Sequence, residues 1–234
     1  VLAALNFQIP DRVPIDLGAT PSSGISAIAY GNLKKHLSIE SGQTRIYDVV
    51  QQLAEPEEMI LDRFAIDAVD LGRTFNRSSR DWYEITLPDG QRAHSPQWVR
   101  PEQDADGGWT ARGVDGLPIA RMPAKSAFFD QTHFPYIDGY PLDYARLPEA
   151  MGTVLRQAFA NSPWDHVGEE RFWETLRSEA IALRASSDRA VMVVCGCNLF
   201  EWGTFLRRLD NFLVDLVTEE REVERLLDAL MELH

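Results

Sequence analysis

The pattern of apolar and polar residues predicts short strands and helices in the first third of the chain. Apolar residues cluster from Val13 to Leu17 and stop at Gly18, which favours a buried strand. A helical spacing follows, with Ser22 and Ser23 before it as N-cap residues. The elements predicted here are the end of a helix at 1–7, a strand at 13–17, a helix at 26–37, helical pieces at 48–53 and 56–64, and a strand at 66–71.

The middle of the chain, from about residue 80 to residue 164, has a different pattern. Asp89 and Gly90 separate two alternating stretches, which is typical of a β-hairpin. Two more short strands are predicted over 107–123, and residues 128–144 combine many aromatic side chains with proline and glycine. We interpret 80–164 as an aromatic-rich, β-containing insertion. Because it follows a strand, we expect it to form a lid at the carboxyl end of the strands.

Alternating helices and strands return after the insertion. The elements predicted here are an amphipathic helix at 169–185, a strand at 190–198, a helix through 206–217 and a helix through 221–233. Strands that alternate with helices form parallel sheets. A barrel of eight such units needs roughly 250 residues without an insertion. If the sheet belongs to a barrel, the chain therefore covers less than half of it.

Composition and charge narrow the class of partner. The chain has 234 residues, of which 44% are apolar and 25% charged, and its formal net charge is −13. A protein this acidic is repelled by nucleic acids and by anionic membranes, so we expect neither as a partner. No apolar run approaches the length of a membrane span, and no signal-peptide pattern is present. We therefore expect a cytoplasmic protein.

Polar residues near the predicted strand ends are candidates for contacts with a small-molecule substrate. A carboxylate inside an apolar strand is costly unless it is paired, which draws attention to Asp16. Helix capping and local packing are the structural alternatives for the other candidates. The full set is Asp16, Ser22, Ser23, His133, Asn198 and Glu201.

Two further pairs of residues have a structural interpretation. Asp67 and Asp70 flank the second predicted strand and face opposite sides of it, so we expect one of them to form a salt bridge with Arg63 or Arg73 rather than an acid–base pair. Cys195 and Cys197 end the third strand and are weak candidates for zinc ligands. Two ligands this close in the sequence are too few for a closed zinc site, so we expect no tight metal binding by this segment.

Three stretches of the chain resemble the uroporphyrinogen decarboxylase superfamily in their residues and in their order along the chain. They are "LNFQIPDRVPIDLG" (5–18), "LAEPEEMILDRFAIDAVDLG" (53–72) and "DRAVMVVCGCNLFEWGTFLRRLDNFLVDL" (188–216). The resemblance implies a (β/α)8 TIM-barrel enzyme, of which residues 1–234 are the N-terminal part. Its members include true decarboxylases and the zinc- and cobamide-dependent methyltransferases.

The residues that mark a true decarboxylase do not match. In that branch two arginines after the first strand grip the carboxylates of a tetrapyrrole, and an aspartate follows the second strand. Ala19 and Ser23 stand in place of the arginines, and Thr74 stands in place of the aspartate. Bidentate recognition of carboxylates requires the guanidinium group. The resemblance therefore favours the methyltransferase branch.

The resemblance implies an activity and its partners. We expect methyl transfer from a small methylated substrate, with cobamide, free or on a corrinoid carrier protein, and with zinc held by residues beyond 234. A homodimer also fits this expectation. The alternatives are a uroporphyrinogen decarboxylase, or a partial barrel that is inactive without its C-terminal half.

Overall fold

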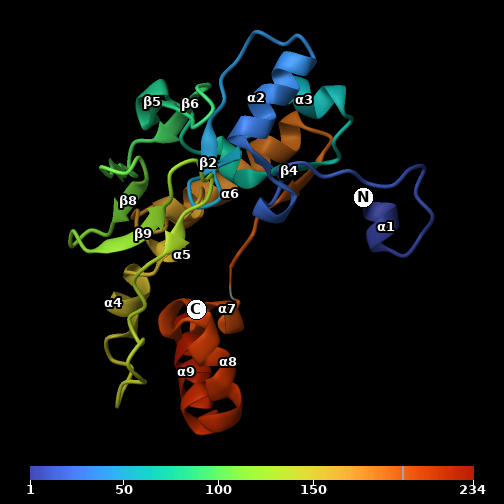
Figure 1. The fold of residues 1–234 in the computed structure, drawn as a ribbon. Coiled ribbons are helices and arrows are strands. Elements are labelled where there is room, and N and C mark those ends of the chain that lie inside the picture. The colour runs from blue at the N-terminus through green and yellow to red at the C-terminus, as the bar shows by residue number, and fades with distance from the viewer. Residues whose placement is uncertain (197) are drawn as a thin grey trace. The chain divides into compact units, whose positions relative to one another are not determined.

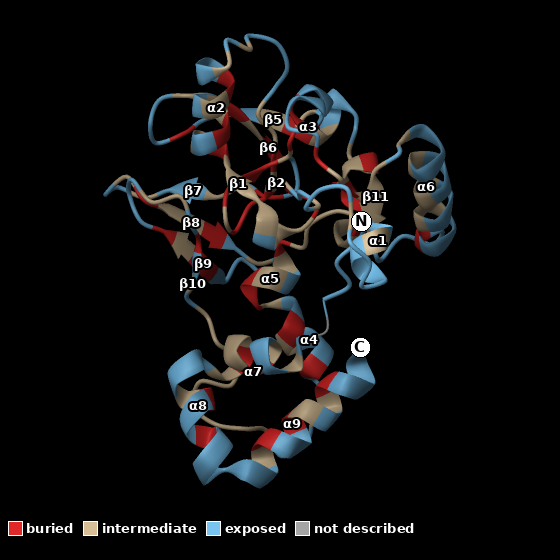
Figure 2. Ribbon diagram, turned by 90° about the vertical axis from the view of Figure 1, so that its right-hand side faces the viewer, coloured by how far each residue is buried: buried red, intermediate tan, exposed pale blue. Residues whose placement is uncertain are grey.

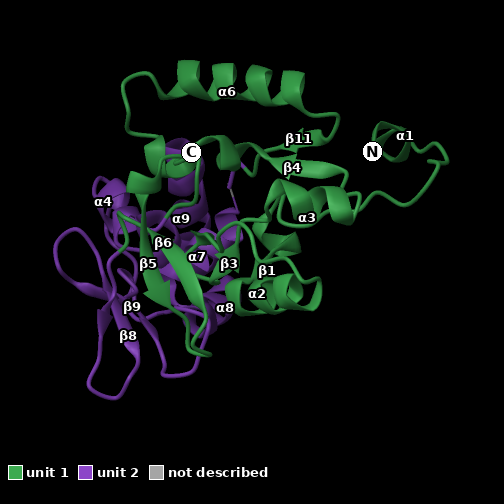
Figure 3. Cartoon of the chain, turned by 90° about the horizontal axis from the view of Figure 1, so that it is seen from above, with its two compact units in different colours: residues 1–99, 160–194 green, residues 100–159, 195–234 purple. Residues whose placement is uncertain are grey.

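The computed structural model describes residues 1–196 and 198–234 and has a mixed α/β fold (Figure 1). The chain divides into two compact units. The first contains residues 1–99 and 160–194, and the second contains residues 100–159 and 195–234 (Figure 3). The sheets formed by the described residues have two to four strands, and none of these sheets closes into a barrel. The predicted mixed class is confirmed. None of the helices in the described ranges is long and apolar enough to cross a membrane.

The first unit contains most of the elements that the sequence predicts. Four short 3-10 helices connect them, at Pro21–Ser23, Leu71–Thr74, Ser79–Asp81 and Trp164–His166. The helices and strands are α1 (Leu2–Leu5), β1 (Ile25–Ser26), α2 (Ala27–His36), β2 (Ile46–Asp48), β3 (Leu53–Ala54), α3 (Glu58–Arg63), β4 (Ala68–Asp70), β5 (Trp82–Thr86), β6 (Arg92–Pro96), α6 (Phe172–Ser186) and β11 (Ala190–Met192).

β4 and β11 form a parallel pair, and α6 precedes β11 in the chain. Ala68 lies opposite Ala190, and Asp70 lies opposite Met192. Parallel strands need a long crossover connection, and here the insertion and α6 provide it. Figure 3 shows the pair between α6 and α3. Val69 of β4 is buried in one hydrophobic cluster with Leu61 of α3, and Leu183 of α6 packs against this cluster. The two helices therefore bury the strand that ends at Asp70.

The strand predicted over 13–17 is wrong, because these residues form no strand. Their backbone is hydrogen-bonded to Asp67, the residue just before β4. The Asp67 N–H donates to the Ile15 carbonyl at 2.8 Å, and the Ile15 N–H donates to the Asp67 carboxylate at 2.8 Å. Pro14 has no N–H to donate, so the backbone cannot continue a ladder. The Asp67 carboxylate thus accepts the N–H hydrogen bond that a neighbouring strand would otherwise accept.

The helical piece predicted over 48–53 is also wrong. β2 and β3 pair antiparallel here, and a turn connects them. The buried Asp48 carboxylate accepts a hydrogen bond from the Gln51 N–H at 2.8 Å, and Gln52 has a φ of 53°. An aspartate side chain that accepts a backbone N–H in this way favours a turn over a helix.

The N-cap of α2 is Ser26 and not Ser22 or Ser23. The Ser26 Oγ accepts a hydrogen bond from the Ala29 N–H at 3.3 Å. The Ser23 Oγ accepts instead from the Gly18 N–H at 3.2 Å. Serine is a good cap only when it directly precedes the first helical turn, and Ser26 alone does so.

The hairpin predicted at Asp89 and Gly90 and the two short strands predicted over 107–123 are confirmed. β5 and β6 pair antiparallel around a turn at Gly90, whose φ is 85°. Residues 80–99 belong to the first unit, and residues 100–159 belong to the second. The elements of the second unit are β7 (Glu102–Gln103), β8 (Trp109–Arg112), β9 (Pro118–Met122), β10 (Asp130–Gln131), α4 (Leu147–Gly152), α5 (Leu155–Ala158), α7 (Leu199–Arg207), α8 (Leu209–Thr218) and α9 (Glu220–Leu233).

The helices α7, α8 and α9 enclose the core of the second unit. One helix was predicted over 206–217, but Arg208 has a φ of 70° and separates α7 from α8. α9 buries one face, with Val223, Leu226 and Leu230 at helical spacing (Figure 2). Three aromatic residues of the insertion, Tyr136, Tyr140 and Tyr144, pack against this core. Part of the aromatic segment is thus accounted for within the second unit.

Candidate functional site

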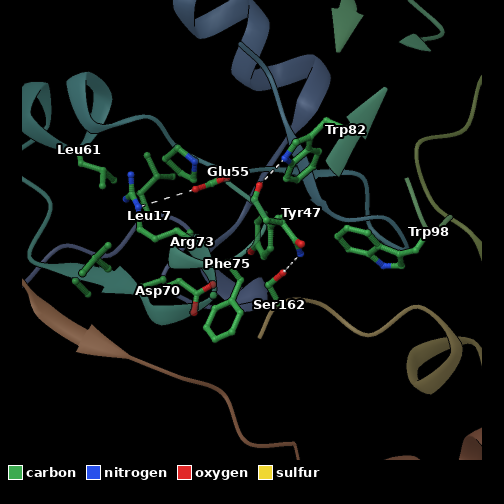
Figure 4. Close-up of a pocket in the computed structure, with 17 residues that line it drawn as sticks. Leu17, Tyr47, Glu55, Leu61, Asp70, Arg73, Phe75, Trp82, Trp98 and Ser162 are labelled. Atoms are coloured by element: carbon green, nitrogen blue, oxygen red, sulfur yellow. Dashed lines mark hydrogen bonds and ion pairs between the residues drawn. The ribbon is translucent and has the colours of Figure 1, made fainter. Parts of the chain in front are cut away.

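A small cavity lies in the first unit, where β4 ends (Figure 4). We call it the β4 cavity. Its free volume is about 30 Å³, which is roughly the space of one or two water molecules. Its polar lining comes from segments far apart in the sequence. The lining residues on which the argument depends are Tyr47, Glu55, Leu61, Val69, Asp70, Gly72, Arg73, Phe75, Asn76, Trp82, Trp98 and Ser162.

Two carboxyl groups in the β4 cavity share the same desolvated space. Glu55 follows β3, and Asp70 is the last residue of β4. Burial raises the pKa of Asp70 to about 7, and the nearby charge of Glu55 adds to the shift. Burial likewise raises the pKa of Glu55, although Arg73 and Arg45 oppose that effect. Asp70 therefore exchanges its proton near neutral pH, as a general acid or base must.

The charge of Arg73 is divided between two other carboxylates. Its Nε lies 4.0 Å from a Glu55 oxygen, and its Nη2 lies 3.5 Å from a Glu58 oxygen. Within the described ranges, no side chain forms an ion pair with Asp70 at 4.0 Å or less. A backbone hydrogen bond from Gly72 and the field of Arg73 only partly offset the burial of Asp70. Asp70 is thus the carboxyl group with spare hydrogen-bonding capacity.

Tyr47 places an unused hydroxyl group at the same cavity. Its Oη is buried and has no hydrogen-bond partner among the described residues. Burial, reinforced by the charges of Asp48, Asp70 and Asp16, raises the pKa of Tyr47, so the phenol stays neutral. A buried polar atom without a partner is costly, and such atoms commonly bind water or a ligand. Tyr47 therefore offers one donor and one acceptor.

Gly72 allows the chain to approach closely behind the cavity. A Cβ at this position would lie 2.2 Å from the Ser162 carbonyl oxygen and 2.7 Å from an Asp70 carboxylate oxygen. The Ser162 carbonyl belongs to the backbone, and Asp70 belongs to a packed strand end, so neither can move away without a cost in free energy. Only glycine fits between them, and it fixes the position of the Asp70 carboxyl group.

Aromatic rings form the other walls of the β4 cavity. Trp82 and Trp98 have ring centroids 6.4 Å apart, and the Trp82 Nε1 donates to the Asn76 carbonyl at 2.7 Å. The guanidinium carbon of Arg45 lies 5.2 Å from the Trp82 ring centroid. This distance is within the range of a cation–π interaction. The aromatic wall is thus fixed by a hydrogen bond and already attracts one cation.

A polar cluster next to the cavity holds the segment at 162–166 in place. The Asn76 amide donates to Ser162 Oγ at 2.8 Å and to Asp165 Oδ2 at 2.6 Å. His166 lies between Asn76 Oδ1 at 3.0 Å and a Glu169 oxygen at 2.6 Å. Burial raises the pKa of Asp165, and its Oδ1 has no hydrogen-bond partner among the described residues. We interpret this cluster as the support of the cavity wall at Ser162.

Three of the candidates that the sequence indicates lie in the first unit, outside the lining of the β4 cavity. Asp16 is exposed, and its carboxylate accepts a hydrogen bond from the Ala19 N–H at 3.0 Å. The premise that Asp16 is buried in a strand is therefore wrong. Its charge still contributes to the raised pKa values of Tyr47 and Asp70. Ser22 is exposed, and Ser23 hydrogen-bonds within its own loop.

The remaining candidates belong to the second unit. Asn198 is the N-cap residue of α7, and its amide donates to Glu201 at 2.8 Å. Both side chains are exposed, and His133 is half-buried. The free Cys195 is exposed and lies after the end of β11, while Cys197 lies outside the described residues. The prediction that 190–198 forms one strand is wrong at residues 193–196, which follow β11 without strand structure.

The salt bridges expected for the β4 aspartates are not the ones observed. Asp67 pairs with Arg12 at 2.7 Å, and Asp70 lines the cavity. A signal for Asp70 was present, because it ends a buried strand two residues before Gly72, as site residues of parallel sheets often do. Glu55 and Tyr47 carry no comparable signal. They reach the cavity only because β2 and β3 form a hairpin.

The donor groups for zinc do not come together in the described residues. Within the part of the chain that the structure describes, no three His, Cys, Asp or Glu side chains are arranged to hold a metal ion. Comparisons with models of protein families, with curated proteins and with solved structures find no match to this chain.

Proposed function

We propose that the chain is the N-terminal part of a (β/α)8 enzyme of the uroporphyrinogen decarboxylase type that transfers a methyl group from a small methylated substrate. The parallel pair of β4 and β11, with α6 between them in the sequence, supports this proposal. A strand, a helix and a parallel strand make up the repeating unit of such barrels. The reaction itself rests on the resemblance at 5–18, 53–72 and 188–216.

The observation that supports the proposal best is the position and lining of the β4 cavity. It lies at the carboxyl end of a parallel strand, which is the edge where barrel enzymes bind their substrates. Leu61 and Val69 supply apolar surface for a methyl group. Asp70 and Tyr47 supply a carboxyl group that titrates near pH 7 and a free hydroxyl group. In this proposal the apolar walls exclude water, and Asp70 takes up or releases a proton as the substrate reacts.

The roles of zinc and cobamide in this proposal rest only on the resemblance to the family. Zinc acidifies a bound thiol and keeps it nucleophilic at neutral pH, and cobamide carries the methyl group. The described side chains do not fit a zinc site, so ligands for it would have to come from other parts of the natural protein. A corrinoid carrier protein as partner, a homodimer and a lid formed by 80–164 remain predictions of the same resemblance.

The decarboxylase alternative has less support at this cavity. Arg73 is the one basic residue in the described lining, and Glu55 and Glu58 already attract its charge. A tetrapyrrole with several carboxylates needs several guanidinium groups and far more room than about 30 Å³. We therefore prefer methyl transfer.

The test is an assay of methyl transfer by the whole natural protein that contains this chain. Small substrates with an isotope-labelled methyl group are incubated with the protein, zinc, cobamide and a thiol, and the thioether is measured by mass spectrometry. We expect a labelled thioether from the wild type and at least a tenfold lower rate from Asp70→Asn. Formation of coproporphyrinogen from uroporphyrinogen, or no methyl transfer from any substrate, would contradict the proposal.

A further inference from the structure

The hydrogen-bonding groups of the β4 cavity are unevenly used. The Asn76 amide donates to Ser162 and Asp165, and Arg73 faces the Glu55 and Glu58 carboxylates at 4.0 and 3.5 Å. Two groups in the described lining have no side-chain partner, namely the Asp70 carboxyl group and the Tyr47 hydroxyl. A ligand with two or more N–H groups could donate to the oxygens of both.

The balance of charge points in the same direction. Arg73 offsets Glu55, whereas Asp70 has no ion-pair partner at 4.0 Å or less in the described ranges. Exposed Asp16 adds a further negative charge close enough to raise the pKa of Asp70. A cation in the cavity would remove the repulsion between these carboxylates, and an anion would increase it.

The walls also suit a cation that carries a methyl group. The Tyr47, Phe75 and Trp82 rings line the cavity, and the Trp82 ring already interacts with Arg45. Aromatic faces attract ammonium groups through their quadrupole. Leu61 and Val69 provide an apolar surface, and the free volume of about 30 Å³ limits the ligand to two or three heavy atoms at most.

We propose that the β4 cavity binds a small primary ammonium cation of the size of methylammonium. Its N–H groups donate to Asp70, to the Tyr47 oxygen and to Glu55, and its methyl group packs on Leu61 and Val69. The proposal rests on the proposed function in one respect, namely that the substrate is a small methylated compound. The unpaired Tyr47 hydroxyl, rather than the number of acidic residues, distinguishes this cavity from an ordinary charged surface.

The experiment is calorimetric titration of the 234-residue chain with methylammonium chloride at pH 7 in two buffers of different ionisation enthalpy. We expect saturable binding together with proton release, because the bound cation favours the ionised form of Asp70. Since Asp70 is about half protonated at pH 7, it would release up to about half a proton for each ligand bound. The same measurement with methanol, which is a neutral molecule of similar size, should show at least tenfold weaker binding.

Two cavity variants and one control keep the inference falsifiable. We expect Asp70→Asn to weaken binding at least tenfold and to abolish the proton release, and Tyr47→Phe to weaken binding about threefold to tenfold. Asp11→Asn, at an exposed position of the same unit, should bind like the wild type. Circular dichroism confirms that each variant is folded.

The outcomes separate this inference from the proposed function. The absence of saturable methylammonium binding, equal binding of methanol, or binding that Asp70→Asn leaves unchanged would overturn the inference. If methyl transfer from another substrate is still observed, the proposed function stands without it. If methylammonium binds but no methyl group is transferred, the inference stands and the proposed reaction fails.

Discussion

The chemistry of the first unit is concentrated in three side chains, Tyr47, Glu55 and Asp70. Each of them is desolvated, but their partners differ. Glu55 faces Arg73, Asp70 has a backbone hydrogen bond from Gly72, and the Tyr47 hydroxyl has no partner among the described residues. Uncompensated polar groups lower stability, and they persist where a ligand or a reaction uses them. This contrast leads to a prediction about single hydroxyl groups.

We predict that Tyr47→Phe leaves the free energy of unfolding unchanged or raises it slightly, because no protein hydrogen bond is lost. The matched variant is Tyr140→Phe, which removes a hydroxyl that donates to the buried Asp215 at 2.8 Å. We expect that change to cost about 1–2 kcal/mol. Urea unfolding of both variants is the measurement. A loss for Tyr47→Phe as large as that for Tyr140→Phe would show that the Tyr47 hydroxyl has a partner in the protein.

At the scale of elements, the site depends on how β4 ends. Asp70 is the last residue of the strand, and the 3-10 helix Leu71–Thr74 turns the chain back at once. Gly72 lies inside that turn, against the Ser162 carbonyl. The turn therefore fixes the Asp70 carboxyl group, and Gly72 makes the turn possible.

Replacement of Gly72 by alanine tests this packing. The new Cβ would lie 2.2 Å from the Ser162 carbonyl oxygen, so we expect a loss of about 2–3 kcal/mol in the free energy of unfolding. Gly168→Ala is the control, because no heavy atom lies within 4 Å of its Cβ position. This control should change stability by less than about 0.5 kcal/mol. Chemical denaturation that gives the same midpoint for both variants would refute the close approach at Gly72.

A comparison of predicted and observed elements shows which sequence signals are sufficient to predict a helix or a strand. The predicted bounds of α2, α6 and α9 lie within a few residues of the observed ones, and in α9 the buried Val223, Leu226 and Leu230 lie on one helical face. The prediction of a strand at 13–17 is wrong because Pro14 has no N–H to donate and the Ile15 N–H donates to the Asp67 side chain instead of to a neighbouring strand. The predicted helix at 48–53 fails because Asp48 closes a turn. Local side-chain hydrogen bonds outweigh apolar spacing in both cases.

At the scale of the whole molecule, each of the two units has its own hydrophobic core. The candidates that the sequence indicates are divided between the units, with Asp16 and Ser23 in the first and Asn198 and Glu201 in the second. The β4 cavity instead combines segments of the first unit that lie far apart in the sequence, such as those of Tyr47 and Ser162, which are 115 residues apart. Such a combination depends on tertiary packing. The positions of strand ends in the sequence therefore predict only Asp70 among the residues of the cavity.

The central claim is that the β4 cavity desolvates the carboxyl group of Asp70. Titration of selectively ¹³C-labelled aspartate carboxyl groups by NMR, assigned with Asp70→Asn, tests this claim directly. We predict that Asp70 titrates at a pKa of about 7, against an ordinary value of 3.8. Because this pKa is raised on folding, the contribution of Asp70 to stability is greatest at low pH and is lost as the pH rises from about 4 to about 7. A measured pKa near 4 would contradict the account, because it would place Asp70 in water rather than in an enclosed site.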